Sequence, residues 1–226
     1  MPVNSCPPDR QSWLKERRRL AEVRYDAVFS RDYDEKYGDI SPTHRRFVQK
    51  LLSLTHPGAR ILDAACGTGK YWGMILEAGR RIVGIDQSSE MLRKAALKYP
   101  GVPSQKMGLQ EMKYVSEFPA AMCVDAMENV SPEDWPLVLA NLASALKSGG
   151  YLYLTVEVIA HDELEDAYKK SRQMGLPVVF GEYAHHGGYH YYPEKRRVEE
   201  WLSGADFEIV ERELGDGYLH YLVKKK

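Results

Sequence analysis

The sequence predicts an α/β domain with a doubly wound, mostly parallel sheet. Two observations predict this fold class: short apolar runs alternate with longer amphipathic segments, and a glycine turn directly follows the first run. At 226 residues the chain is long enough for one well-cored domain with an inserted lid, whereas two full domains would be cramped. We therefore expect residues 1–226 to form a single domain.

The elements of the alternation lie in order along the expected core, residues 57–158. Candidate strands are the apolar runs 60–64, 81–85, 120–124 and 151–158, each close to a turn signal. The helix predicted over 135–147 is the clearest, because its apolar residues follow helical spacing: Trp135, Val138, Leu139, Leu142 and Leu146. We expect Gly149 and Gly150 to end this helix in the left-handed conformation.

Two regions fall outside the alternation. Residues 1–56 are expected to form a helical cap over the sheet, with one helix beginning at Ser41-Pro42. Residues 159–204 are expected to be an inserted lid with an acidic helix near 162–174, and binding residues often collect in such insertions. Residues 205–226 hold two half-buried runs that meet at Gly215-Asp216-Gly217, which predicts an antiparallel hairpin at one sheet edge.

Charge and cysteine content limit the classes of partner and of cellular compartment that we expect. Lys+Arg 31 against Asp+Glu 32 gives a net charge of -1, so no basic excess attracts nucleic acid or an anionic membrane. The cysteines number 3 and have no paired spacing, which is typical of a reducing compartment. No stretch resembles a signal peptide or approaches the roughly 20 apolar residues of a membrane span. We expect a cytoplasmic protein with no nucleic-acid or membrane partner.

The glycine turn lies in the segment RILDAACGTGKYWGMILEAGRRIVGIDQSSEML, residues 60–92. A phosphate loop is excluded, because Tyr71 follows Gly69-Lys70 where a serine or threonine is required. A dinucleotide fingerprint is disfavoured, because Trp72 stands where its third glycine would allow close packing. Asp86 closes the second run, and an acidic side chain there can bind both hydroxyls of a ribose. The turn is therefore expected to hold a nucleoside without requiring a pyrophosphate.

Several motifs occur together along the chain. They are Asp63-Ala-Ala-Cys-Gly67-Thr-Gly69, Gly84-Ile-Asp86, Ser88-Ser-Glu-Met91-Leu92, MGLQEM from Met107, MCVDAMENVSPEDW and LKSGGYLYLTVE. Over roughly residues 25–157 this set resembles the class I S-adenosylmethionine-dependent methyltransferases, particularly the small-molecule branch of ubiquinone and menaquinone methylases (methyltransferase type 11). The resemblance implies a Rossmann-like, seven-stranded sheet with an antiparallel C-terminal hairpin strand. It also implies S-adenosylmethionine as cofactor and S-adenosylhomocysteine as its product.

The resemblance further implies the cofactor contacts. The methionine part would face the backbone of Ala65, Gly67 and Gly69, the ribose would face Asp86, the adenine would face Gln87, Met91, Leu109 and Gln110, and the sulfonium would lie beside Asp125. Gly108 departs from the common form, because an aspartate is often found at its position. Asp63 is expected either to touch the cofactor or to anchor the loop.

Aromatic residues of the N-terminal cap have two alternative roles. Tyr25, Tyr33 and Tyr37 recur at near-helical spacing, which is typical of core packing. Helical caps in the resembled family also contribute contacts that close over the cofactor. We expect Tyr25 to be the cap residue that does so.

Methyl transfer requires an in-line acceptor and, for a hydroxyl or a carbon, a positioned base. The candidates are Asp125 and Glu128 after the fourth strand, and His185, His186, His190, Tyr191 and Tyr192 in the lid. The histidines either face the substrate or lie at the surface. A metal site that includes them and Glu182 is disfavoured, because their spacing matches no zinc pattern, and we expect no metal.

The leading hypothesis is a methyltransferase that acts on a small molecule, because the aromatic, histidine-bearing lid could enclose a ring. A protein or peptide methylase with the same core is an alternative that predicts an open groove. A nonenzymatic S-adenosylmethionine-binding partner subunit is another, and it predicts a degraded cofactor site. The motifs leave the methylated atom and the oligomeric state open.

Overall fold

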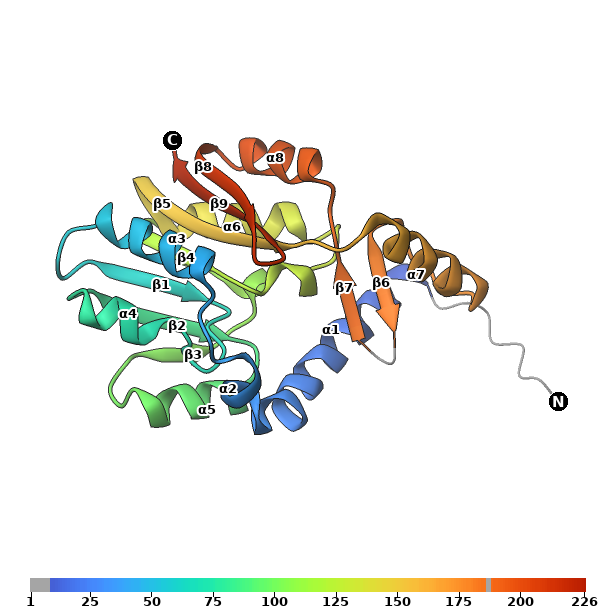
Figure 1. Ribbon diagram of the computed structural model, residues 1–226, viewed down its shortest axis with the longest axis horizontal. Helices are drawn as coiled ribbons and strands as arrows, with labels where there is room; N and C mark the ends of the chain where they lie inside the picture. Colours follow the sequence, from blue (N-terminus) through green and yellow to red (C-terminus); the bar gives the residue numbers. More distant parts are fainter. Residues whose placement is uncertain (1–8, 186–187) are drawn as a thin grey trace.

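The computed structural model describes residues 9–185 and 188–226. A seven-stranded sheet forms the centre of the molecule, with strand order β3-β2-β1-β4-β5-β9-β8 (Figure 1). Its strands are β1 (Arg60–Ala64), β2 (Arg81–Asp86), β3 (Ser104–Lys106), β4 (Phe118–Cys123), β5 (Leu146–Glu157), β8 (Phe207–Gly215) and β9 (Tyr218–Lys225). Strands β1 to β5 pair in parallel, and β9 is antiparallel to both β5 and β8. The predicted fold class, including the antiparallel C-terminal hairpin strand, is confirmed.

Helices cover both faces of this sheet. On one face lie α3 (Pro42–Ser53), α4 (Trp72–Glu77) and α5 (Ser89–Lys98), and on the other lie α6 (Trp135–Ala145) and α8 (Lys195–Gly204). Each face buries its own apolar cluster, because alternate residues of a strand point to opposite sides of the sheet. Helix α5 begins where Ser88 Oγ accepts the Met91 amide at 3.1 Å.

Helix α1 (Arg10–Ala27) joins distant parts of the chain, running from α5 to the hairpin β6–β7 (Figure 1). Near its C-terminal end, Asp26 accepts a hydrogen bond from Ser88 Oγ at 2.6 Å. Near its N-terminal end, Arg10 donates to Glu182 in β6 at 2.8 Å. The one-turn elements η1 (Phe29–Arg31) and α2 (Tyr33–Tyr37) lead from α1 to α3.

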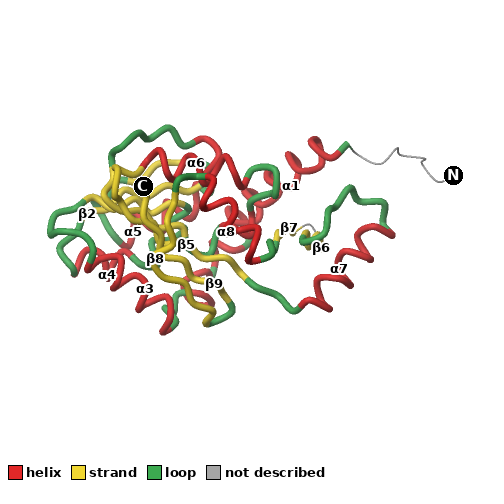
Figure 2. The backbone as a smooth tube through the Cα atoms, turned by 90° about the horizontal axis from the view of Figure 1, so that it is seen from above, coloured by secondary structure: helices red, strands yellow, loops and turns green. Residues whose placement is uncertain are grey.

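The segment between β5 and α8 extends beyond the main body, as the tube view shows (Figure 2). It contains α7 (His161–Gln173) and the antiparallel hairpin of β6 (Glu182–His185) and β7 (Gly188–Tyr191). The acidic helix was predicted, but the hairpin was not. Helix α8 lies on the sheet beside α6, with Val198 and Leu202 buried in the shared core. No helix of the described ranges is both long and apolar enough to cross a bilayer.

One expectation about local structure is wrong, and one strand was not predicted. Gly149 and Gly150 do not end α6, which stops at Ala145; they lie inside β5. The β4–β5 register shifts between Phe118 and Ala120, and Gly149 has φ +74° there, so the glycines accommodate a bulge. Strand β3 was not predicted, because its residues 104–106 are all exposed and carry no apolar signal.

Trp72 locks α4 onto the sheet. Its ring is fully buried, and its indole Nε1 donates to Asp63 Oδ2 at 2.8 Å. The ring fits because Gly84 in β2 has no side chain: a Cβ there would lie 2.5 Å from Trp72 Cζ2. The place of the third glycine in a dinucleotide fingerprint is thus filled by a tryptophan, and Gly84 supplies the room.

Replacing Gly84 with alanine should destabilise the fold by about 1–3 kcal/mol, because the new Cβ would overlap the buried Trp72 ring. Urea unfolding followed by circular dichroism measures the change. Gly204→Ala is the matched control, because its Cβ would meet no atom within 4 Å, and it should not lower stability. Equal losses in both variants would contradict this role of Trp72.

Asp63→Asn should remove a pH dependence of stability. Burial, reinforced by the charge of Asp86, raises the pKa of Asp63 to about 7, from 3.8 in the unfolded chain. Since the folded state then binds the proton more tightly, stability falls as the pH rises from about 5 to 7 and levels off above the folded-state pKa. Asparagine keeps an oxygen for Trp72 but carries no charge, so the variant should gain about 2 kcal/mol on wild type across that range. Urea unfolding at both pH values tests this, and a pH-independent difference would refute it.

Candidate functional site

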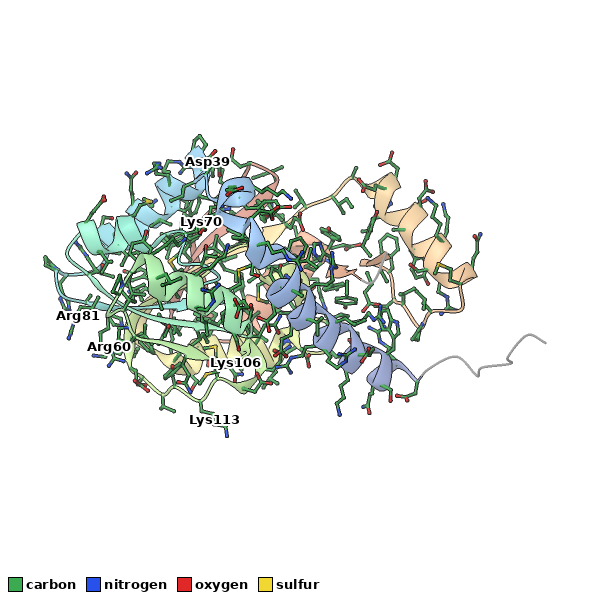
Figure 3. The ribbon with its side chains drawn as sticks, turned by 90° about the horizontal axis from the view of Figure 1, so that it is seen from below. Asp39, Arg60, Lys70, Arg81, Lys106 and Lys113 are labelled. Atoms are coloured by element: carbon green, nitrogen blue, oxygen red, sulfur yellow. The ribbon has the colours of Figure 1, made fainter. Side chains whose placement is uncertain are left out.

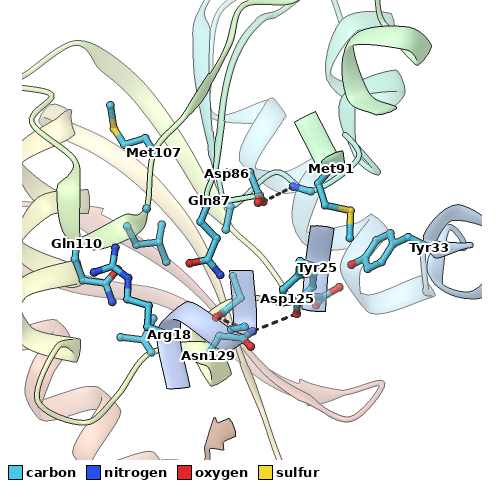
Figure 4. Close-up of a pocket in the computed structure, with 17 residues that line it drawn as sticks. Arg18, Tyr25, Tyr33, Asp86, Gln87, Met91, Met107, Gln110, Asp125 and Asn129 are labelled. Carbon is cyan, nitrogen blue, oxygen red and sulfur yellow. Dashed lines mark hydrogen bonds between the residues drawn. The ribbon is translucent and has the colours of Figure 1, made fainter. Parts of the chain in front are cut away.

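A pocket opens at the carboxyl ends of β1, β2 and β4, which is the usual ligand position in an open α/β sheet. We call it the cofactor pocket. Figure 4 shows Arg18 and Gln110 at one end and Tyr33 at the other. Its lining comprises Arg18, Ala21, Tyr25, Tyr33, Ala65, Gly67, Asp86, Gln87, Met91, Met107, Gly108, Leu109, Gln110, Asp125, Ala126, Asn129 and Val130.

The glycine turn after β1 adopts left-handed backbone conformations. Gly67 has φ +53° and Gly69 has φ +75°, and Ala65 has φ +62° despite its side chain. Strain of this kind in a non-glycine residue collects at functional sites. Ala65 and Gly67 line the cofactor pocket, whereas Gly69 packs against Trp72 and does not.

Asp86, at the end of β2, is held by backbone amides. Its Oδ2 accepts the Gly67 amide and its Oδ1 accepts the Ser88 amide, each at 2.8 Å. Burial raises the pKa of Asp86, while these hydrogen bonds favour the charged form. Each oxygen keeps a further acceptor site. The carboxylate can therefore bind two neighbouring hydroxyl groups in the pocket.

The end of the pocket formed by Gly108, Leu109 and Gln110 is closed by a side chain of α1. Arg18 forms an ion pair with Glu111, and both side chains fill the space beside Gly108, where a Cβ would lie 2.6 Å from Arg18 Nη2. An aspartate at position 108 would therefore displace this pair.

A second pocket of about 470 Å³ adjoins the first, and we call it the acceptor pocket. Figure 3 labels Asp39 and Lys70, two of its residues. Ala21, Tyr25, Tyr33, Asp125 and Asn129 line both pockets. The other lining residues are Arg24, Phe29, Lys36, Tyr37, Asp39, Ser41, His44, Lys70, Glu128, Glu157, Tyr189, His190, Asp216 and Tyr218.

Asp125 lies where the two pockets meet. Its Oδ1 accepts from His44 Nε2 at 2.9 Å, its Oδ2 lies 3.6 Å from Lys70 Nζ, and its amide donates to Thr155 Oγ1 at 2.8 Å. Burial alone would raise the pKa of Asp125, but His44 and Lys70 lower it below the ordinary value. The residue also has φ +52°. Asp125 is therefore a charged carboxylate on a strained backbone, a combination that is typical of functional sites.

Glu128 is the other predicted acid after β4. It is buried in the 3₁₀ turn η3 (Met127–Asn129) and lines only the acceptor pocket. Burial, followed by the charges of Glu157 and Asp125, raises the pKa of Glu128 to about 8. Its Oε1 accepts from Asn129 Nδ2 at 3.2 Å.

The lid histidines separate in the structure. His190 lines the acceptor pocket, with Nδ1 at 3.4 Å from Glu157 Oε2. His185 belongs to β6, but its side chain lies outside the described residues, as does all of His186. Glu182 is engaged by Arg10 and by the Tyr189 hydroxyl at 2.6 Å. No group of metal-ligating side chains within the described ranges could hold a metal ion.

Asp63 lies outside the lining of either pocket. Its carboxylate is buried against Trp72, as an anchor of the loop would be.

Residues that the sequence did not single out contribute to both pockets. His44, Lys70 and Tyr218 line the acceptor pocket, and Arg18 lines the cofactor pocket. His44 lies in the first turn of α3, whose pattern indicates only core packing, and its partner Asp125 is 81 residues away in the chain. Lys70 directly follows the glycine motif, and this is the one local signal for any of these residues.

Comparison with known proteins matches residues 61–150 to the methyltransferase domain family. The chain is similar to malonyl-[acyl-carrier protein] O-methyltransferase of Serratia marcescens, with 29% identity over 142 residues, 59% of this chain and 53% of that protein. It therefore spans about half the length of that relative. It is also similar to ubiquinone biosynthesis O-methyltransferase of Xanthomonas campestris pv. campestris, with 25% identity over 182 residues, 75% of this chain and 70% of that protein.

Solved structures share the fold. The 1,6-didemethyltoxoflavin-N1-methyltransferase of Burkholderia thailandensis has a TM-score of 0.71 at 19% identity, covering 100% of this chain and 94% of that one. The magnesium protoporphyrin IX methyltransferase of Synechocystis has a TM-score of 0.67 at 15% identity, covering 93% and 100%. The sheet order and the matched domain thus agree with the sequence motifs: residues 61–150 match a methyltransferase domain, and the chain shares the fold of these solved methyltransferases.

Proposed function

We propose that the protein transfers the methyl group of S-adenosylmethionine to a nucleophilic oxygen, nitrogen or carbon atom of a small molecule. The observation that carries this proposal is the common wall of the cofactor and acceptor pockets, which includes Tyr25, Tyr33 and Asp125. Direct transfer needs two bound molecules whose reacting atoms lie in line at contact distance. Two pockets that meet provide that placement.

The cofactor pocket fits S-adenosylmethionine in the donors and acceptors that it offers. The free acceptor sites of Asp86 suit the two ribose hydroxyls, and Gln87 and Met91 lie beside it for the adenine. The left-handed turn at Ala65 and Gly67 leaves backbone open to the methionine part. The Burkholderia and Synechocystis relatives are described with bound S-adenosylhomocysteine, which is the product expected here.

When bound, S-adenosylmethionine supplies a methyl group on a cationic sulfur: the acceptor lone pair bonds to the methyl carbon, the carbon–sulfur bond breaks with its electrons on sulfur, and the acceptor loses a proton. Asp125 holds a negative charge at the junction of the pockets, which favours a cationic group there. Both ring nitrogens of His44 are engaged, by Asp125 and by Ser41 Oγ, so His44 positions Asp125.

Proton removal depends on the acceptor. An amine needs no strong base, whereas a hydroxyl or a carbon gains from one. Glu128 and His190 are the predicted titratable residues that line only the acceptor pocket, and we propose that they serve this step. Since His190 comes from the hairpin β6–β7, the lid segment 159–204 contributes to the reaction as well as to enclosure.

The acceptor pocket favours a ring of modest size. Tyr33, Tyr37, Tyr189 and Tyr218 line it, and aromatic faces bind flat apolar molecules. Helix α1 and the hairpin both supply parts of the wall, so we propose that the N-terminal helices and the lid together set substrate choice.

Asp86→Ala should weaken the binding of S-adenosylmethionine and S-adenosylhomocysteine by about 100-fold or more, because two hydrogen bonds to a charged group are lost. Titration calorimetry of the purified protein with both compounds and with NAD measures this. Circular dichroism checks that the variant is folded.

Asp39→Asn is the matched control, because Asp39 is an exposed acid that lines only the acceptor pocket. It should bind both compounds as wild type does. Binding of NAD alone, or equal losses in the two variants, would contradict the proposed cofactor site.

A further inference from the structure

One oxygen of Glu128 is buried without a hydrogen-bond partner. The residue is 6% exposed, and its Oε2 has no donor within the part of the chain that the structure describes. A buried carboxyl oxygen without a donor costs free energy, which a ligand can recover by supplying one. Glu128 lines the acceptor pocket and not the cofactor pocket, so the acceptor pocket is the side from which a ligand could supply this donor.

A second carboxylate stands near Glu128. Glu157, at the end of β5, lines the same pocket, and its charge contributes to the raised pKa of Glu128. Among the described residues, no lysine or arginine forms an ion pair with either acid, and the side chains that contact Glu157 are those of His190 and Tyr192. The two carboxyl groups therefore form an acidic pair without a strong cation.

The basic residues of the pocket are engaged elsewhere. Lys70 faces Asp125 at 3.6 Å, and Lys36 pairs with Asp32 at 2.6 Å. Arg24 lies over an aromatic ring, 5.1 Å from its centroid. None of these cations is paired with the acidic pair.

We propose that Glu128 and Glu157 bind a basic nitrogen of the acceptor, so the substrate is a small amine whose cationic group lies against this pair. The inference rests on the proposed function and names its substrate class. A cationic donor satisfies Oε2 of the ionised Glu128, compensates the negative charges of the two acids, and can lie against the tyrosine faces of the same pocket.

The titratable groups around Glu128 come from several elements. They are Tyr25 of α1, Tyr33 of α2, Cys123 and Asp125 at the end of β4, Glu157 of β5, Tyr192 and His190 of the lid, and Tyr218 of β9. Since the pKa of Glu128 is about 8, the carboxyl is mostly protonated at neutral pH. An ammonium group that binds beside it should expel that proton.

The test is titration of the full chain, saturated with S-adenosylhomocysteine, with matched pairs of aromatic amines and alcohols. Suitable pairs are tyramine with tyrosol and tryptamine with tryptophol, at up to millimolar concentration. The amines should bind about tenfold more tightly than the alcohols, as expected for a charge-assisted hydrogen bond. Calorimetry in buffers of different ionisation enthalpy should record proton release on amine binding at pH 7.

Glu128→Gln should abolish both the amine preference and the proton release. Glu157→Gln should reduce the preference, and Glu208→Gln, at an exposed acid of β8 that lines neither pocket, should change neither. All three variants should bind S-adenosylhomocysteine as wild type does, which shows that they are folded and keeps this test separate from that of the cofactor site.

Three results would overturn the proposal: alcohols that bind as well as amines, an amine preference that survives in Glu128→Gln, or no binding by any amine of the panel. If the wild-type protein did not bind S-adenosylhomocysteine, this result would instead refute the proposed function.

Discussion

A row of carboxylates at one edge of the sheet is the constraint on which the rest of the structure depends. The neighbouring strands β2, β1, β4 and β5 each end at or beside an acid: Asp86, Asp63, Asp125 and Glu157. Parallel strands bring these ends to the same edge, so like charges accumulate. Each acid has a different polar partner. Backbone amides bind Asp86, and the Trp72 indole binds Asp63. His44 and Lys70 lie beside Asp125, and His190 lies beside Glu157. The edge remains acidic, which suits a cofactor whose sulfur is cationic.

Most of the fold could be predicted because its signals are local. Strands β1 and β2 are apolar runs on either side of the glycine turn and α4. A strand that is buried on both faces of a sheet requires such a run. Other elements depend on tertiary contacts. The hairpin β6–β7 packs Tyr189 against Trp13 of α1, with ring centroids 5.6 Å apart, and no local pattern predicts that pairing. Gly149 and Gly150 were misinterpreted because left-handed glycines serve equally well in a helix stop and in a strand bulge.

The candidate site likewise contains residues that local motifs predict and residues that only the fold brings together. Residues within the glycine motif and at the end of β2, such as Gly67 and Asp86, line the cofactor pocket because their spacing in the chain sets their place in the fold. The acceptor pocket is assembled from remote segments. His44 contacts Asp125, and Glu128 lies near Glu157, only when the sheet and its helices have assembled. The roles of such pairs could not be predicted, because no local sequence pattern marks residues that meet only in the folded chain.

Arg18 fills the space beside Gly108, although it belongs to α1 and lies outside the matched domain of residues 61–150. Helix α1 also supplies Ala21 and Tyr25 to both pockets. A single helix therefore forms part of the wall of both pockets, and it is held near its two ends by Asp26 and Arg10. A change at either of these ends would therefore alter both pockets together.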